Sequence, residues 1–316
     1  MNSGYLGIDV GGTNLRFGVY VGDRCVVGYR TEVNLAERCA QAANPEAAQQ
    51  LVLDALAGGF HRLREQCPQL AGVGVAFPGF ITADGILHQS PNLPQLQDFA
   101  LEAALAENLQ VPAVLENDAN AAAYGEFRSC QQDHPELQSL LYVGLGTGVG
   151  GGWVHAGRPW RGEHGTAMEI GHLIVVPGGR RCGCGNQGCL EQYASVQGLV
   201  SSYLEYSGMH ADPLIIAQLA RDGNSEAQRA FRTLAEFLGA ALAHAVKLLD
   251  CGQIRVGGGL SGAWDCFGDE LVQQFRANLI PVLREAVEIG PGNHDDDAGM
   301  RGAALLAQEL LSSCCG

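Results

Sequence analysis

The feature that most constrains this chain is a short unit that occurs twice, a strand followed by a Gly-Thr turn and a returning strand. In the first copy, apolar residues alternate through 6–10 and again through 15–21, on either side of the turn. Such alternation is typical of half-buried strands. The second copy runs from residue 140 to residue 155 around another Gly-Thr turn. Two matches this short can arise by chance, but they predict a duplicated α/β domain in which each copy supplies one phosphate-binding loop.

Helices and further strands alternate along the rest of the chain, as expected of an α/β fold. The sequence predicts helices at 45–66, from 119, at 226–249 and at 299–311, with strands at 72–77, 111–115 and 253–256. Because 316 residues exceed the usual size of one hydrophobic core, we expect two lobes.

The charge of the chain limits its partners. A net charge of −15 disfavours binding to nucleic acid or to anionic membranes, and we expect neither as a partner. The single lysine, Lys247, lies outside the glycine-rich segments, which excludes a Walker-type phosphate loop. Any bound phosphate must therefore be held by backbone N–H groups, helix N-termini and Mg²⁺.

The absence of targeting signals predicts a cytoplasmic protein. No signal peptide precedes Tyr5, and no apolar run reaches the length that a membrane span requires. Of the eleven cysteines, six are scattered through regular segments, where we expect buried thiols in a reducing compartment. These six are Cys25, Cys39, Cys67, Cys130, Cys251 and Cys266.

Three glycine-rich turns are candidate phosphate loops, because backbone N–H groups can approach a phosphate closely there. Asp9 precedes the first turn, and its carboxylate could hold Mg²⁺ through water; the alternative is an ordinary hairpin. The second turn matches a dinucleotide-binding pattern, but a strand follows it where that pattern requires a helix. The third follows the strand at 253–256. The turn residues are Gly11, Gly12 and Thr13; Gly146, Thr147 and Gly148; and Gly257, Gly258 and Gly259.

Polar side chains at strand ends and in loops are candidates for catalysis and sugar binding. Asn117 and Asp118 lie between a predicted strand and a helix, where both residue types make good caps. Asp118 could instead be a general base that takes the proton of an attacking hydroxyl. Glu169, Glu191 and Asn92 could grip a polyhydroxylated ligand, although a solvated loop position is the simpler interpretation of each alone.

A cysteine cluster predicts a metal site. Cys182, Cys184 and Cys189 are packed into residues 182–189 among glycines, which permit the tight path that a tetrahedral ion demands. His172 would complete a Cys₃His set, and His164 is the only plausible substitute. A redox pair is the competing interpretation, but the first two cysteines are spaced C-x-C rather than C-x-x-C. We therefore predict a structural Zn²⁺ that rigidifies this loop.

Taken in order, these motifs resemble the ROK family of sugar kinases and repressors over essentially the whole chain. The resemblance implies a two-lobed actin-like ATPase fold, a duplicated RNase H-like α/β architecture, with a zinc-stabilised loop. The implied lobes are residues 1–117 plus 299–316, and residues 118–298, with sugar and ATP meeting between them. The matching segments are Asp9-Val-Gly-Gly-Thr13, Glu116-Asn-Asp-Ala-Asn120, Leu145-Gly-Thr-Gly-Val-Gly150, Glu169-Ile-Gly-His172 and residues 182–191.

The resemblance also implies a role for each matching position. Asp118 is the implied catalytic base; ATP, Mg²⁺ and structural Zn²⁺ are the implied cofactors, and a homodimer is the usual assembly. Asp9 and the three glycine turns are the implied ATP contacts. The implied sugar contacts are Gly79, Asn92, Asn117, Asp118, Glu169, His172 and Glu191, and the implied zinc ligands are His172, Cys182, Cys184 and Cys189.

The family contains two functional classes, and the resemblance favours the kinases. Family repressors carry a DNA-binding helix-turn-helix ahead of the sugar domain, whereas here the first strand begins at Tyr5. A non-catalytic sugar-sensing protein is the alternative from the other class. The segments 90–93 and 188–195 look most like those of glucokinases, which implies phosphorylation of the 6-hydroxyl of glucose in carbohydrate metabolism, at the start of glycolysis. N-acetylglucosamine, N-acetylmannosamine, fructose and allose stay alternative substrates because their kinases share nearly all these motifs.

Overall fold

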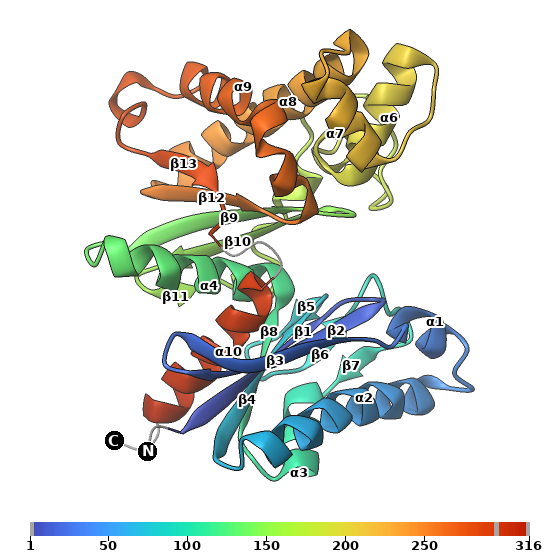
Figure 1. Ribbon diagram of the computed structural model, residues 1–316, viewed down its shortest axis with the longest axis vertical. Coiled ribbons are helices and arrows are strands. Elements are labelled where there is room, and N and C mark those ends of the chain that lie inside the picture. Colours follow the sequence, from blue (N-terminus) through green and yellow to red (C-terminus); the bar gives the residue numbers. More distant parts are fainter. Residues whose placement is uncertain (1–2, 294–296, 314–316) are drawn as a thin grey trace. The chain divides into compact units, whose positions relative to one another are not determined.

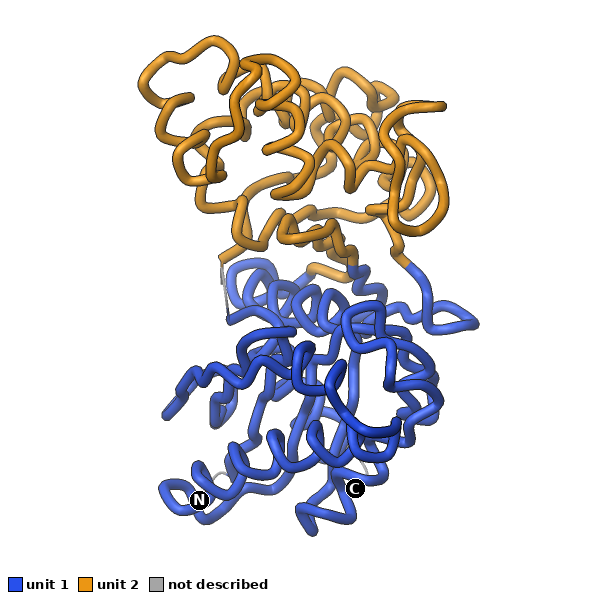
Figure 2. Tube along the Cα trace, turned by 90° about the vertical axis from the view of Figure 1, so that its right-hand side faces the viewer, with its two compact units in different colours: residues 1–136, 152–167, 297–316 blue, residues 137–151, 168–296 orange. Residues whose placement is uncertain are grey.

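The computed structural model describes residues 3–293 and 297–313 and divides into two compact units (Figure 2). Unit 1 comprises residues 1–136, 152–167 and 297–316, and unit 2 comprises residues 137–151 and 168–296. These bounds place residues 118–136 in unit 1, whereas the lobes expected from the sequence begin a new lobe at Asp118. That lobe boundary stays a prediction.

Unit 1 is built on a five-stranded sheet (Figure 1). Its strands are β1 (Gly4–Val10), β2 (Asn14–Val21), β3 (Arg24–Glu32), β4 (Leu70–Phe77) and β8 (Ala113–Asn117). Their order is β3-β2-β1-β4-β8. β2 is antiparallel to both neighbours, while β1, β4 and β8 are parallel. The carboxyl ends of these three strands therefore meet at one edge of the sheet, where α/β folds bind their ligands.

Helices cover both faces of this sheet (Figure 1). One face packs on α1 (Leu35–Ala40), α2 (Pro45–Gln66) and α3 (Leu101–Leu109), and the other on α4 (Asp118–Asp133) and α10 (Ala298–Ser313). The predicted alternation of Leu6, Ile8 and Val10 is confirmed, because all three belong to the core that includes residues of α2. Helix α1 was not predicted, although its buried Leu35 and Cys39 have helical spacing.

Glycines let helix α10 approach the sheet and helix α4 unusually closely. A Cβ atom at Gly7 would lie 2.0 Å from the carbonyl oxygen of Met300, and one at Gly74 would lie 1.8 Å from that of Ala303. Gly302 is equally constrained, because its Cβ would lie 1.7 Å from the carbonyl oxygen of Ala121. Helix α10 is thus held in backbone contact with β1, β4 and α4.

A small antiparallel sheet extends from β4. Its strands, in the order β5-β6-β7, are β5 (Phe80–Ile81), β6 (Leu87–Gln89) and β7 (Gln97–Phe99). The sheet follows the Pro78-Gly79 corner and belongs to unit 1. It therefore lies at the carboxyl end of β4, beside the candidate site.

The second large sheet repeats the arrangement of the first. Its order is β11-β10-β9-β12-β13, with β12 parallel to β9 and β13 and β11 antiparallel to β10. Three residues join β9 to β10, a link too short for a parallel crossover. The predicted duplication is confirmed. The strands are β9 (Ser139–Leu145), β10 (Val149–His155), β11 (Arg158–Pro159), β12 (Gln253–Gly257) and β13 (Glu288–Pro291).

The α-helices of unit 2 follow the cysteine segment in the sequence. The predicted long helix is α8 (Ser225–Leu249), and α5 (Glu191–Ala194), α6 (Val196–Ser207), α7 (Pro213–Arg221) and α9 (Trp264–Ala277) pack with it; the 3₁₀ turns are η1 (Ile170–His172), η2 (Gly259–Ala263) and η3 (Pro281–Leu283). Among the described residues, no helix has both the length and the apolar character that a membrane crossing needs. Cys39, Cys130 and Cys251 are buried as expected, but Cys67 and Cys266 are only half-buried and Cys25 is exposed.

Candidate active site and metal centre

The carboxyl edge of the unit 1 sheet gathers several of the predicted residues. In the register of the parallel strands, Asp9 pairs with Ala76, and Ala76 pairs with Glu116. Asn117 and Asp118 follow at the end of β8 and the start of α4. The strand order therefore brings residues that lie far apart in the sequence to one edge.

Asn117 caps α4, as the simpler interpretation of the sequence predicted. Its side-chain oxygen accepts hydrogen bonds from the backbone N–H groups of Ala119 (3.0 Å) and Asn120 (3.1 Å). Its amide nitrogen donates to the carbonyl oxygen of Gly79 at 3.0 Å. Gly79 has a φ of 149°, and a Cβ there would lie 2.5 Å from the carbonyl oxygen of Gln89. Asn117 thus joins the start of α4 to the corner after β4.

Asp118 is the first residue of α4 and the strongest candidate for a catalytic base. Its Oδ1 accepts a hydrogen bond from the Ala119 N–H at 2.9 Å. Burial raises the pKa of Asp118, and hydrogen bonds from the Ala119 and Asp118 N–H groups oppose the rise without cancelling it. A carboxylate whose pKa is raised takes up a proton more readily, which suits a general base.

A buried ion pair beneath this edge was missed by the sequence analysis. Glu116 is 2% exposed and accepts a hydrogen bond from Arg161 Nε at 2.8 Å. Its other oxygen accepts from the Asn117 N–H (3.0 Å) and Asn120 Nδ2 (3.2 Å). A glutamate inside the apolar strand Ala113–Asn117 was the available signal, because buried charges need partners. The ion pair fixes the backbone at the end of β8, directly before Asn117 and Asp118.

The first glycine turn lies at the same edge. Arg16 Nη1 donates to Asp9 Oδ2 at 3.0 Å, which orients the carboxylate. The Gly11 N–H donates to the Asn14 carbonyl at 2.9 Å and closes the turn. Thr13 is exposed and Gly12 is half-buried, so this hairpin presents backbone N–H groups and a hydroxyl outward.

The other two glycine turns meet in unit 2. Gly257 of β12 pairs with Gly144 of β9, so both turns follow the carboxyl ends of adjacent parallel strands. Gly258 has a φ of 79°, and a Cβ there would lie 2.6 Å from both the N and O atoms of Leu145. The turn of residues 146–148 is closed by the Gly146 N–H, which donates to the Gly148 carbonyl at 2.9 Å. The three candidate phosphate turns therefore form one pair in unit 2 and a single hairpin in unit 1.

The cysteine segment of unit 2 forms a four-ligand cluster. The ligand atoms of His172, Cys182, Cys184 and Cys189 all lie within 4.8 Å of one another. Two of the separations are 3.7 Å, from Cys182 Sγ to His172 Nδ1 and from Cys184 Sγ to Cys189 Sγ. Zn–S bonds of about 2.3 Å in a tetrahedron place sulfurs about 3.8 Å apart. The cluster therefore fits zinc, and His172 rather than His164 is the histidine in it.

The thiols of this cluster differ in their environments. Burial raises the pKa of Cys189 to about 12. The backbone N–H of Asn186 lowers the pKa of the exposed Cys184. Thiolates are the ligands that zinc prefers, and metal binding removes their protons.

Arg180 anchors the metal loop and was also missed. It pairs with Glu205 through Nε (3.0 Å) and Nη2 (2.8 Å), and Nη2 also donates to Ser202 Oγ at 2.9 Å. Its Nη1 donates to the Gln192 carbonyl at 2.6 Å, and its guanidinium lies 4.6 Å from the Tyr193 ring centroid. No sequence motif marks this residue, because its partners come from the following two helices.

The two glutamates next to the cluster connect it to the candidate ligand residues. Glu169 Oε2 lies 3.8 Å from His172 Nε2. The other ring nitrogen of His172, Nδ1, is the one near Cys182. Glu191 Oε1 lies 3.9 Å from Cys182 Sγ, and its Oε2 accepts from the Val149 N–H at 3.2 Å. Glu191 thus joins the metal cluster to the glycine turn of residues 146–148. Asn92, the last candidate, is an exposed loop residue of unit 1.

Comparison with known proteins places these features in one family. The model of the ROK family matches residues 5–310. A glucokinase from Halalkalibacterium halodurans is 30% identical, with 98% of this chain and 96% of the relative covered. An N-acetyl-D-glucosamine kinase from Vibrio cholerae is 30% identical, with 96% and 99% covered.

A solved structure shows the same likeness in three dimensions. The crystal structure of a ROK family glucokinase from Streptomyces griseus, in complex with glucose and AMPPNP, has a TM-score of 0.81 to this chain. The two are 29% identical, and the alignment covers 97% of this chain and 99% of the other.

Proposed function

The chain belongs to the ROK family and is related to its sugar kinases, and we propose that it transfers the γ-phosphate of ATP to the 6-hydroxyl of glucose. The observation that carries this proposal is the carboxylate of Asp118, held at the start of α4 with a raised pKa. Its placement at the carboxyl ends of parallel strands is where this class of fold positions its chemistry.

Asp118 acts in this proposal as the general base. Its carboxylate accepts the proton of the sugar hydroxyl as the hydroxyl oxygen forms a bond to the γ-phosphorus. The bond from that phosphorus to the bridging oxygen breaks, and ADP leaves with its electrons. Phosphoryl transfer needs mainly positioning and charge stabilisation, so one carboxylate and well-placed backbone donors suffice.

The sugar contacts that we propose offer the acceptors a polyol needs. Glu169 and Glu191 are carboxylates that can each accept from two hydroxyls, and Asn117 retains amide capacity beyond its capping bonds. His172 would contact the sugar while also holding the metal. The full proposed set is Gly79, Asn92, Asn117, Asp118, Glu169, His172 and Glu191.

The nucleotide contacts in this proposal are backbone groups. The turn of residues 11–13, with those of 146–148 and 257–259, would bind ATP without a lysine, as the composition of the chain requires. Asp9 would hold Mg²⁺ through water, since Mg²⁺ commonly uses one or two carboxylates together with substrate phosphates.

The metal role that we propose is structural. His172, Cys182, Cys184 and Cys189 would hold Zn²⁺, whose full set of protein ligands leaves no position for substrate. Zn²⁺ would supply a rigid cross-link in the loop. His172 and Cys182 of the cluster lie next to Glu169 and Glu191, respectively, and would keep these two carboxylates oriented.

The sugar itself, the assembly and the location also belong to the proposal. The glucokinase of H. halodurans supports glucose, and the N-acetyl-D-glucosamine kinase of V. cholerae at equal identity makes N-acetylglucosamine the second candidate. We extend the proposal to a cytoplasmic homodimer with lobes 1–117 plus 299–316 and 118–298. A non-catalytic sugar sensor is disfavoured because Asp9 and Asp118, the carboxylates proposed for Mg²⁺ and for proton transfer, are both present.

The deciding experiment measures ADP release with ATP and each of five sugars: glucose, N-acetylglucosamine, N-acetylmannosamine, fructose and allose. We expect the highest kcat/KM with glucose and a product that carries phosphate on its 6-oxygen, identified by phosphorus NMR. A higher kcat/KM with another sugar would replace glucose. Sugar binding without ADP release from any of the five would contradict the kinase assignment.

A further inference from the structure

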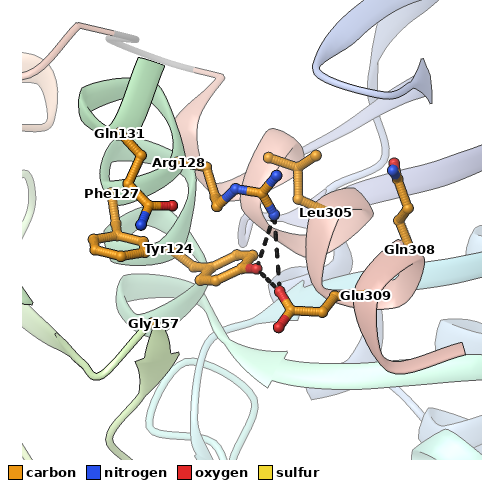
Figure 3. Close-up of a pocket in the computed structure, with 8 residues that line it drawn as sticks. All are labelled: Tyr124, Phe127, Arg128, Gln131, Gly157, Leu305, Gln308 and Glu309. Carbon is orange, nitrogen blue, oxygen red and sulfur yellow. Dashed lines mark hydrogen bonds and ion pairs between the residues drawn. The ribbon is translucent and has the colours of Figure 1, made fainter. Parts of the chain in front are cut away.

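A cavity of about 590 Å³ that is open to solvent lies between α4 and α10 of unit 1. It lies outside the set of residues proposed above for sugar, ATP or metal. Its volume falls within the range of small-molecule sites in proteins, which are about 300–1,000 Å³. Its polar and apolar walls include Tyr124, Arg128, Gln131, Leu305, Gln308 and Glu309 (Figure 3).

Three side chains form a polar triad on the walls of this cavity (Figure 3). Tyr124 donates its hydroxyl proton to Glu309, and Arg128 Nη1 donates to the Tyr124 oxygen at 3.1 Å. The same Nη1 lies 3.8 Å from the Glu309 carboxylate. Burial raises the pKa of Tyr124 to about 12, so the phenol stays protonated and keeps this arrangement at neutral pH.

The charges of the triad favour a neutral ligand. Arg128 and Glu309 compensate each other, and Asp23 also acts on Arg128 electrostatically. An added anion would find only one cation, Arg128, whose charge two carboxylates already neutralise. The net charge of −15 on the chain would repel it further. A neutral molecule avoids this repulsion.

The remaining polar groups match hydroxyls. A guanidinium has five N–H donors, and the Arg128 contacts described above use only Nη1. Gln308 Oε1 is buried with no hydrogen-bond partner in the described structure, whereas such atoms normally have one. Because terminal amide torsions are broad, the Gln308 amide can turn to meet a ligand. Amide groups donate and accept, as hydroxyl groups do.

From this geometry we propose that the α4–α10 cavity is a second ligand site, for a neutral polyhydroxylated molecule of monosaccharide size. Arg128 donates to its oxygens, and Gln308 exchanges hydrogen bonds with its hydroxyls. The cavity is thus separate from the candidate substrate residues, and it takes the same chemical class of ligand.

The position of the cavity also implies that a ligand bound there affects Asp118. This consequence rests on the proposed function. Asp118 begins α4, and a Cβ at Gly299, near the start of α10, would lie 3.3 Å from Asp9 Oδ1. Between these ends and the cavity the two helices touch, since a Cβ at Gly302 would lie 1.7 Å from the Ala121 carbonyl oxygen. A ligand that shifts the far halves of the helices therefore acts on Asp118 through rigid, closely packed backbone.

Hydrogen exchange with mass spectrometry, without ATP, tests the binding. The neutral probes are D-glucose and N-acetyl-D-glucosamine, and glucose 6-phosphate is the charged comparison. We expect a neutral sugar at ten times its Kd to slow exchange about tenfold in peptides that cover 124–131 and 305–309. Slowing by glucose 6-phosphate alone would overturn the neutral class, and no slowing by any probe would overturn the site.

Variants separate this site from the candidate substrate site. Slowing should survive in Glu191→Ala, which alters the candidate substrate residues, and in the exposed control Arg38→Met. It should disappear in Arg128→Met and in Gln308→Leu, the latter of which leaves the triad intact. Slowing that persists in both variants would contradict the proposal. These outcomes do not depend on turnover, so a failure of the kinase assignment would show separately in the ADP-release assay.

The kinase assay tests the coupling to Asp118. We expect kcat in wild type to change about fivefold as sugar fills the second site, beyond the concentration that saturates the substrate site, and to stay constant in Gln308→Leu. A rate that is independent of second-site occupancy in wild type would overturn the coupling.

Discussion

The carboxyl edges of the two duplicated sheets differ in the groups that they present: one carries carboxylates and the other carries glycine backbone. In unit 1 the edge carries carboxylates, which the protein's own groups hold: Arg16 pairs with Asp9 and Arg161 with Glu116. In unit 2 the edge is glycine backbone, with Gly258 pressed against Leu145. The loop beside it carries a cluster of four side chains that could hold a metal ion.

This difference shows how one strand arrangement can serve two tasks. The topology only decides where loops meet, and the residues placed there decide the chemistry. Unit 1 holds its carboxylates with ion pairs and hydrogen bonds, so the fold of its edge should not require a bound metal. Unit 2 offers neutral N–H groups and a thiol cluster, so its loop should depend on a metal.

The largest effect is expected at the carboxylate of unit 1. Asp118→Asn keeps the shape of the side chain but cannot accept the proton, so kcat should fall about 10³-fold with little change in the KM for sugar. The matched control is Asp133→Asn, at the exposed far end of α4, which should leave kcat within twofold, about the scatter expected of a neutral surface change. Comparable turnover in Asp118→Asn would remove Asp118 from its proposed role.

The same carboxylate should set the pH dependence. Burial raises the pKa of Asp118, and the base form is the ionised one, so kcat/KM should fall about tenfold per pH unit below that pKa. The acid limb should therefore lie above pH 3.9, the ordinary value for aspartate. Because the folded-state pKa is above the unfolded one, ionised Asp118 lowers folding stability, and stability should rise as the pH falls through the folded value. Asp118→Asn should accordingly raise Tm at pH 7, measured by calorimetry.

Removing a metal ligand should affect unit 2 alone. Cys184→Ala should abolish stoichiometric zinc in elemental analysis and raise the KM for sugar by about tenfold or more, because Glu169 and Glu191 lose their rigid support. Cys266→Ala, outside the cluster, is the control and should keep both properties. With a chelator, hydrogen exchange should quicken in residues 172–191 and not in the unit 1 sheet. Equal quickening in both units would break the contrast.

The ion pair beneath Asp118 should matter mainly for unit 1. Arg161→Met leaves the buried Glu116 without its cation, and since Arg161 is itself partly exposed we expect a loss of about 2 kcal/mol in unfolding free energy. The exposed Arg158→Met is the matched control and should change stability by less than about 0.5 kcal/mol. Urea unfolding measures both. Equal stabilities would mean that hydrogen bonds from Asn117 and Asn120 suffice to hold Glu116.

The parts of this contrast that the sequence predicted are those with local signals. The alternation of Leu6, Ile8 and Val10 predicted β1, and Asn117 was recognised as a possible cap. The cysteine spacing predicted the cluster of three thiols with His172. Arg161 and Arg180 were missed because their partners are distant in the sequence and no periodicity or spacing relates them. The resemblance to the ROK family supplied a role for Gly79 that no local pattern could.

The smallest effect on stability is expected at Gly12, and its comparison with Gly258 contrasts the two edges directly. A Cβ at Gly258 would lie 2.6 Å from the backbone of Leu145, and its φ is 79°. At Gly12 the nearest atom would be the Ala36 Cβ at 3.6 Å, an ordinary contact. Gly258→Ala should therefore cost about 1–3 kcal/mol of strain and raise the KM for ATP. Gly12→Ala should leave stability nearly unchanged. If the turn at 11–13 contacts phosphate through bare backbone, Gly12→Ala would still raise the KM for ATP at unchanged stability. An unchanged KM would mark that turn as an ordinary hairpin and leave nucleotide binding to the glycines of unit 2.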